Sequence, residues 1–278
     1  MTDARRDAHV GATWTVLGAG AILPRPGYGC SGYALRPAPG APLTLFDCGP
    51  GTLRSLAEAG LVLADVRRVV LSHFHPDHCL DVLALAFARK NPGFEAPPLE
   101  LIGPTGLVDW LERAAKLYGD RGWLRFDDTE VREVDPGAQG SLELSDMRLS
   151  WVATRHTPNA LAWRADLSAA SGTVSLAYTG DSGENPDVAA LARGVDLFVC
   201  ECSFADEHAT EHHLSPSSAA RMALAARARR LLLTHFYPGL DPGAAREVAA
   251  RTFPGPIELA ADRSVHELGP SMEARPRT

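Results

Sequence analysis

The sequence predicts an α/β fold in which two mixed β-sheets pack face to face and helices cover their outer faces. The chain has 278 residues, of which 45% are hydrophobic and 22% charged, so it can bury a sizeable core. Short apolar runs of strand length alternate with segments whose apolar residues recur at helical spacing. This alternation occurs in both halves of the chain, and each half is therefore expected to supply one sheet and its helices.

The first half opens with three strand-like runs that Gly- and Pro-rich turns separate. Two further apolar runs alternate with three helical patterns. Strands are therefore expected at 13–20, 31–36, 43–49, 66–73 and 99–104, and helices at 52–60, 77–90 and 105–119.

The second half repeats this plan. Strands are expected at 129–135, 142–146, 147–156, 160–167, 173–181, 195–203, 229–236 and 256–262, and helices at 186–194, from about 217, and at 242–253. The helix near 217 has a clear start, because Ser215 can cap it and Pro216 needs no N–H partner there. No repeat or linker divides the chain, so one domain is expected over 11–268, with flexible tails at 1–10 and 269–278.

Charge and cysteine content limit the partners and the compartment. The formal net charge is -7, from 34 acidic and 27 basic residues, which disfavours a nucleic-acid partner. The five cysteines are odd in number and irregularly spaced, unlike a secreted disulfide framework. No stretch approaches the roughly 20 apolar residues that a membrane span needs. The sequence therefore predicts a cytoplasmic protein that acts away from membranes.

The segment "LSHFHPDHCLDVLAL", residues 71–85, places three histidines and an aspartate within six positions. His73 and His75 lie in the predicted turn between a strand and a helix. Asp77 and His78 begin that helix and can point toward the same space. Imidazole nitrogens and carboxylate oxygens are the ligands that zinc and its first-row neighbours prefer, so the segment predicts a metal site.

Three further candidate ligands follow apolar runs directly. His156, Asp181 and His235 each end a predicted strand, in "MRLSWVATRH", "VSLAYTGD" and "RRLLLTH". Together with the first four residues they make seven ligands, more than one zinc ion can use. Because a carboxylate can bridge two ions, the sequence predicts two metal ions.

These motifs resemble the metallo-β-lactamase superfamily, and the resemblance extends from about Val16 to Ala261. It implies a four-layer αββα sandwich with the site at one edge, and two divalent ions, zinc first and manganese or iron as alternatives. It also implies three ligands for each ion and one bridge. The first ion takes His73, His75 and His156, the second takes Asp77, His78 and His235, and Asp181 bridges them.

Two segments narrow the resemblance to the ribonuclease Z branch: "FDCGPGT" and the stretch from Glu201 to Phe236. The resemblance makes Asp47 an acceptor that orients a ligand histidine. It also makes Glu201 and His213 a pair that protonates the leaving group, as a histidine steered by a carboxylate can near neutral pH. Asp77, Glu201 and His213 are thus the expected catalytic residues.

The sequence departs from tRNA-processing ribonuclease Z at one place. Those enzymes usually carry a long basic arm before the bridging aspartate, whereas only "TPNALAWRADLSAASGTVSLAYTG" separates His156 from Asp181 here. That segment has room for two strands and a turn. With the acidic net charge, it makes a small-molecule substrate the expectation and nucleic acid unexpected.

The expected reaction is hydrolysis of a small-molecule phosphodiester by a metal-bridging hydroxide. The loop "GAGAILPRPGYGCSGY" is expected at the rim of the site, where Tyr28 or Tyr33 could contact substrate. Asp181 argues against a true zinc β-lactamase, which usually has cysteine or serine there. The alternatives are a carbon-centred hydrolase (lactonase, thioesterase or weak β-lactamase), a tRNA 3′-processing endonuclease and an iron-dependent redox protein. A homodimer stays open.

Overall fold

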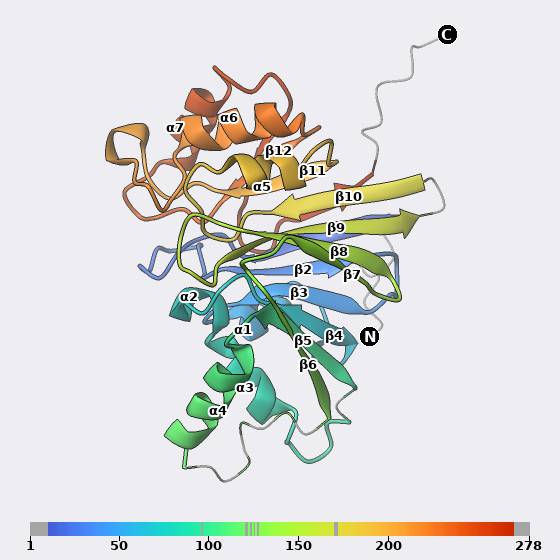
Figure 1. The fold of residues 1–278 in the computed structure, drawn as a ribbon. Coiled ribbons are helices and arrows are strands. Elements are labelled where there is room, and N and C mark those ends of the chain that lie inside the picture. The colour runs from blue at the N-terminus through green and yellow to red at the C-terminus, as the bar shows by residue number, and fades with distance from the viewer. Residues whose placement is uncertain are drawn as a thin grey trace.

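Two seven-stranded β-sheets form the centre of the molecule, and helices lie on the outside (Figure 1). The structure is a computed structural model that describes residues 11–95, 97–119, 122, 124, 126, 128–169 and 172–269. The tails predicted at 1–10 and 269–278 lie outside these residues, apart from Gly269. Among the described helices, none combines the length and the apolar composition needed to cross a bilayer.

The first sheet has the order β14-β1-β2-β3-β4-β5-β6. Its strands are β1 (Ala12–Gly18), β2 (Gly32–Arg36), β3 (Leu43–Cys48), β4 (Val66–Val70), β5 (Leu99–Pro104), β6 (Thr129–Val134) and β14 (Val265–Leu268). Pairing is antiparallel from β14 to β3 and parallel from β3 to β6, so the sheet is mixed. The short strand β14 was not predicted, and β6, which was expected with the strands of the second half, belongs to the first sheet because it pairs with β5.

The second sheet has the order β13-β12-β11-β10-β9-β8-β7. Its strands are β7 (Gly140–Glu143), β8 (Met147–Ala153), β9 (Leu161–Ala169), β10 (Gly172–Tyr178), β11 (Leu197–Glu201), β12 (Leu231–Thr234) and β13 (Ile257–Leu259). The strands from β7 to β10 are antiparallel and those from β10 to β13 are parallel. Strands β9 and β10 pair as a hairpin and span most of the segment between His156 and Asp181. The prediction of two strands and a turn in this segment is confirmed.

The helices form two outer layers, one beside each sheet (Figure 1). The first layer holds α1 (Thr52–Glu58), α2 (Pro76–Cys79), α3 (Asp81–Ala88) and α4 (Leu107–Leu117), and the second holds α5 (Pro186–Leu191), α6 (Pro216–Ala226) and α7 (Pro242–Ala249). Two single 3₁₀ turns, η1 (Leu63–Asp65) and η2 (Asp206–His208), complete the described elements. The helix predicted at 77–90 is instead divided at Leu80 into α2 and α3.

Three apolar cores hold the four layers together. The central core lies between the sheets and includes Trp14 and Trp163, both fully buried. A second core joins the second sheet to α5, α6 and α7, and a third joins the first sheet to α1, α3 and α4. Each large buried side chain stabilises the fold by roughly 1.5–3 kcal/mol. The predicted αββα sandwich is thereby confirmed.

Candidate metal centre

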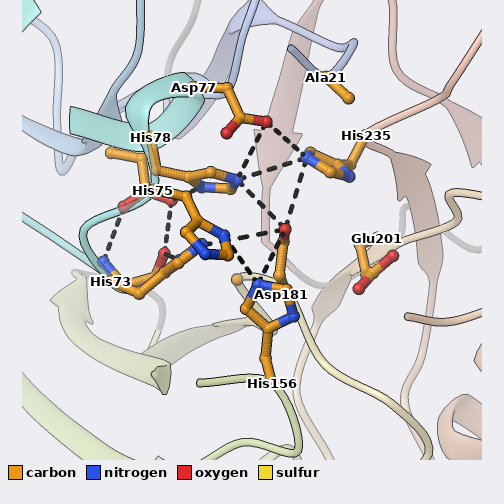
Figure 2. Close-up of polar contacts among 12 residues, drawn as sticks. Ala21, His73, His75, Asp77, His78, His156, Asp181, Glu201 and His235 are labelled. Carbon is orange, nitrogen blue, oxygen red and sulfur yellow. Dashed lines mark hydrogen bonds and ion pairs between the residues drawn. The ribbon is translucent and has the colours of Figure 1, made fainter. Parts of the chain in front are cut away.

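The chain segments that follow β4, β8, β10 and β12 bring the predicted ligand residues together (Figure 2). The strands expected to reach His156 and Asp181 end earlier, at Ala153 and Tyr178, so both side chains lie on loops. Gly180 has a φ of 56°, and a Cβ there would lie 2.7 Å from Ser72 Cβ. A glycine at this position therefore lets the Asp181 loop approach the end of β4.

One group of ligand atoms belongs to His73, His75, His156 and Asp181, which lie within 4.8 Å of one another. His75 Nδ1 is 3.0 Å from His156 Nε2, and Asp181 Oδ2 is 3.7 Å from the same nitrogen. His73 Nε2 is 4.0 Å from Asp181 Oδ2. These four side chains surround one point in Figure 2.

A second group comprises Asp77, His78 and His235, again within 4.8 Å of one another. His78 Nε2 and His235 Nε2 are 3.3 Å apart, and Asp77 Oδ2 is 3.4 Å from His235 Nε2. Asp181 Oδ1 lies 3.2 Å from His78 and 3.5 Å from His235. The two oxygens of Asp181 thus face different groups, which is the geometry of a bridging carboxylate.

Buried polar atoms without partners show whether these residues fit metal ions. Among the described residues, His73 Nε2 and Asp181 Oδ1 are buried and form no hydrogen bond, an arrangement that costs about 1–3 kcal/mol for each atom. Each faces other ring nitrogens or carboxylate oxygens, so a cation would satisfy both. Nitrogen and oxygen donors suit zinc and neighbouring first-row metals. The site therefore fits two divalent cations.

Asp47 joins the metal centre to the sheet behind it. Its Oδ1 accepts a hydrogen bond from Ser72 N at 2.7 Å. Its Oδ2 lies 2.7 Å from His78 Nδ1 and accepts a hydrogen bond from the Tyr178 hydroxyl at 2.7 Å. Because Asp47 is fully buried and engages Nδ1, it turns Nε2 of His78 toward the ligand group. Asp47 also has a φ of 54°, a strained value for a residue with a side chain.

Other ligand histidines are oriented in the same way. His156 Nδ1 lies 3.1 Å from the His212 carbonyl oxygen, and His235 Nδ1 lies 2.9 Å from Ser203 Oγ. These bonds fix the ring orientation and leave Nε2 of both histidines facing the metal centre. The sequence did not identify Ser203 or the His212 carbonyl, because neither residue type nor spacing marks them.

The electrostatics differ between the ligand residues. Burial lowers the pKa of His78, but the charges of Asp181 and Asp47 outweigh it and raise that pKa well above its usual value. Metal binding at His78 would therefore displace a proton. Burial alone would raise the pKa of Asp181, but the nearby charges of His235 and His78 hold it well below its usual range. Burial is also the main cause that lowers the pKa of His73 well below its usual value. Asp181 is therefore anionic and His73 neutral near pH 7, as ligands must be.

Glu201 and His213 form a pair beside the metal centre. Glu201 is fully buried, and its Oε1 lies 3.0 Å from His213 Nδ1 and accepts a hydrogen bond from Ser182 N. His213 Nδ1 is in turn 3.9 Å from Asp181 Oδ2. Burial lowers the pKa of His213, but the hydrogen bond and charge of Glu201 outweigh it and raise the pKa to about 9. Because Nδ1 is engaged, Nε2 is the nitrogen that can give a proton.

The rim loop after β1 corrects one prediction. Tyr33 is fully buried in the central core, and its hydroxyl oxygen lies 2.8 Å from Thr234 Oγ1, so it cannot contact substrate. Because side chains alternate between the two faces of β2, the Tyr33 ring points into the core, where it stacks on Trp14. Tyr28 is half-buried against Phe236, and Gly20 of the same loop forms a β-bridge with Phe236, next to His235.

Two aromatic residues near the site were not predicted. Tyr237 follows His235 by two positions, and its ring centroid is 5.7 Å from that of His235. Phe204 packs against Tyr237 with ring centroids 4.7 Å apart. The proximity of Tyr237 to His235 in sequence was an available signal, whereas the contact with Phe204 joins residues from separate segments.

Comparison with known proteins places these features in a family. The family model described as "Beta-lactamase superfamily domain" matches residues 44–236. An uncharacterised protein of Mycobacterium tuberculosis is 34% identical over 252 residues, covering 87% of this chain and 87% of that protein. A ribonuclease Z of Nocardia farcinica is 30% identical over 298 residues, covering 89% of this chain and 94% of the ribonuclease.

Solved structures give the same result for the fold. A metallo-β-lactamase fold protein of Bacillus subtilis superposes with a TM-score of 0.79 at 24% identity, covering 93% of this chain and 99% of that one. The alignment with the Nocardia ribonuclease is 298 positions long, although it includes only 89% of this 278-residue chain. That ribonuclease therefore has residues for which this chain has no counterpart.

Proposed function

The chain belongs to the metallo-β-lactamase superfamily, and we propose that it is a dinuclear metal-dependent hydrolase that cleaves small-molecule phosphodiesters. The pairing of Glu201 with His213 beside Asp181 is the observation that carries this proposal. Hydrolysis of a phosphodiester expels an alkoxide, which needs a proton, and a histidine held by a buried carboxylate can supply it. Under this proposal, His213 is held in a fixed position from which it protonates the leaving alkoxide.

The side chains of the site have separate roles in the proposed reaction. When bound, the two ions supply Lewis acidity, which lowers the pKa of a water molecule and neutralises charge on the phosphoryl group. Asp77 would help to hold one ion, and its carboxylate could accept a hydrogen bond from the attacking water. Glu201 keeps His213 oriented and protonated, and His213 Nε2 gives its proton to the departing oxygen.

The substrate is proposed to be small. The hairpin of β9 and β10 leaves no room in sequence for a long arm before Asp181, and the net charge of -7 offers little attraction to RNA. The 30% sequence identity to the Nocardia ribonuclease Z nevertheless makes tRNA 3′ processing a second candidate function. Lactones, thioesters and β-lactams are the substrates of the carbon-centred alternatives. They differ from phosphodiesters in the atom that water attacks or in the group that leaves.

A substrate panel with metal-reconstituted protein tests the proposal. Bis(p-nitrophenyl) phosphate, a lactone, a thioester, a β-lactam and a precursor tRNA are offered at equal enzyme concentration. We expect turnover of the phosphodiester to exceed that of the others. Turnover of the precursor tRNA or of a carbon ester in its place would overturn the assignment, and oxygen consumption by iron-loaded protein would indicate redox chemistry.

Variants connect the activity to the site. Asp181→Ala and His78→Ala are expected to lower the metal content below two ions per chain and to reduce phosphodiester turnover at least 100-fold, by loss of the bridge or of a ligand. His208→Ala is the matched control, because His208 is exposed on η2 and is not among the proposed ligands. Circular dichroism checks that each variant is folded. Wild-type turnover in either ligand variant would contradict the scheme.

A further inference from the structure

We propose that Tyr237 and Phe204 form an aromatic wall that binds a planar ring on the leaving alcohol of the substrate. The aromatic wall consists of these two side chains alone. This inference rests on the proposed phosphodiesterase function and assigns part of its specificity. A nucleoside is the chemical class of alcohol that carries such a ring next to a hydroxyl group.

The aromatic wall adjoins the proposed proton donor. The ring of Phe204 meets that of His213 edge to face, with centroids 5.6 Å apart and planes at 87°. The ring of Tyr237 lies 6.2 Å from that of His213 and 5.7 Å from that of His235, at 71° to both. His213 and His235 themselves lie parallel, at 9° and 6.0 Å. These four rings therefore form one contiguous cluster beside the candidate metal centre.

The two residues of the wall are only partly buried. Tyr237 and Phe204 are both half-buried, whereas Tyr33 and Tyr178 of the central core are at most 2% exposed. An aromatic face that a protein leaves accessible beside a reaction centre can stack on a flat ligand. The two side chains are thus not fully enclosed by the core and can contact a ligand.

The turn that carries Tyr237 is held in place by the rim loop. Leu240 N donates a hydrogen bond to Tyr237 O at 3.0 Å, and the Arg25 guanidinium donates one to Leu240 O at 2.9 Å. Phe236 N donates to Ala19 O at 3.0 Å. A ring on a fixed turn binds a ligand with little loss of conformational freedom, so the wall is preorganised.

The reaction geometry determines which part of the substrate meets the wall. The leaving oxygen must lie within hydrogen-bond reach of His213 to receive its proton. The remainder of the alcohol therefore extends from His213, whose ring Phe204 and Tyr237 both contact. A planar ring there can stack on the wall, while a bare sugar or short alkyl group gains little.

Adenosine and ribose are matched probes of this wall, because they share the sugar hydroxyls and differ by the planar ring. Their affinity for metal-loaded protein is measured by calorimetric titration and by inhibition of bis(p-nitrophenyl) phosphate hydrolysis. We expect adenosine to bind at least 10-fold more tightly than ribose. Tyr237→Leu and Phe204→Leu should each weaken adenosine binding about 5- to 100-fold, the range for stacking on one aromatic side chain, and leave ribose affinity unaltered.

Two further variants make the result specific. Tyr237→Phe keeps the ring and should retain the affinity for adenosine, whereas an equal loss in Tyr237→Phe and Tyr237→Leu would overturn the stacking role. Tyr118→Leu is the matched control, because Tyr118 is 57% exposed at the end of α4. Metal content must match the wild type in every variant.

The outcomes separate the two proposals. If the wild type hydrolyses phosphodiesters but binds adenosine and ribose equally, the aromatic wall is refuted and the proposed function stands. If the wild type hydrolyses no phosphodiester, the proposed function fails whatever the nucleoside affinity is. Unchanged adenosine affinity in both Leu variants also refutes the wall.

Discussion

At the scale of single residues, the metal centre depends on how each ligand side chain is held from behind. Asp47 lies 2.7 Å from His78 Nδ1, and Ser203 Oγ lies 2.9 Å from His235 Nδ1. Such contacts fix which ring nitrogen faces the ions, and their loss typically costs 10- to 100-fold in metal affinity or activity. The site is therefore built as much by these supporting residues as by the ligands.

The role of His213 predicts a dependence on the leaving group. His213→Ala should reduce kcat strongly, about 100- to 10,000-fold, for phosphodiesters whose leaving alcohol is strongly basic. The same variant should change kcat far less for bis(p-nitrophenyl) phosphate, because p-nitrophenolate leaves without a proton. Rates for alkyl and p-nitrophenyl esters measured side by side decide this point. An equal loss for both substrates would show that His213 does not protonate the leaving group.

The clustering of the seven candidate ligands could be predicted because residue chemistry and spacing agree. His73, His75, Asp77 and His78 lie within six positions, and the other three each follow an apolar run. Tyr33 was predicted wrongly, because its ring faces the core from β2, where it is 0% exposed. The aromatic wall was missed because Phe204 and Tyr237 meet through tertiary structure that no local pattern encodes.

At the scale of elements, the helix starts were easier to predict than the helix breaks. The Ser215–Pro216 signal correctly marked α6, which begins at Pro216. The apolar period from Asp77 to Lys90 did not reveal the division at Leu80, because Leu80 itself has right-handed helical angles, φ -65° and ψ -32°. The predicted ends of β8 and β10, at His156 and Asp181, were also too late. Both residues lie on the loops that follow these strands.

The N-terminus of α7 offers a test at this scale. Asp241 caps the helix by accepting a hydrogen bond from Ala244 N at 2.7 Å. Asp241→Ala should lower the free energy of unfolding by about 1 kcal/mol, since it leaves that N–H without its acceptor. Urea denaturation of Asp241→Ala and of the cap-retaining control Asp241→Asn measures the difference. Equal losses in both variants would contradict the capping role.

At the scale of the whole molecule, the two sheets are joined by chain segments that are distant in sequence. Strand β14 adds to the first sheet by pairing with β1, with Thr15 opposite Val265. It is four residues long, and its burial alternates along the strand, so little in the local sequence distinguishes it from a loop. The division into two sheets was predictable from the repeated alternation, but this return of the C-terminal chain was not.

Glu258 links the sheets at that return and predicts a pH-dependent stability. It lies on β13, with Oε1 2.9 Å from the Arg230 guanidinium and Oε2 2.5 Å from His266 Nδ1 on β14. The hydrogen bond from His266 is the main cause that lowers the pKa of Glu258, and the charge of Arg230 adds to it. A lowered folded-state pKa means that the stabilisation is present above the unfolded pKa and is lost as pH falls through the folded value.

Glu258→Gln should therefore lower the free energy of unfolding at pH 7. Its difference from the wild type should shrink as the pH falls below about 4.3, the ordinary value for a glutamate carboxyl group. Glu143→Gln is the control, because Glu143 is 74% exposed and pairs with Arg148 at the surface. Denaturant titrations at pH 7 and at pH 3.5 measure both differences. A Glu258→Gln effect that stays constant between these pH values would refute the link.

Seven clustered side chains from four chain segments are proposed to hold two metal ions, with Asp181 between them. Anomalous diffraction at the zinc absorption edge, from crystals of metal-reconstituted protein, tests this claim most directly. We expect two peaks, roughly 3.5–4 Å apart as in other two-metal sites, with one oxygen of Asp181 toward each. A single peak, or peaks away from residues 73–78, would contradict it.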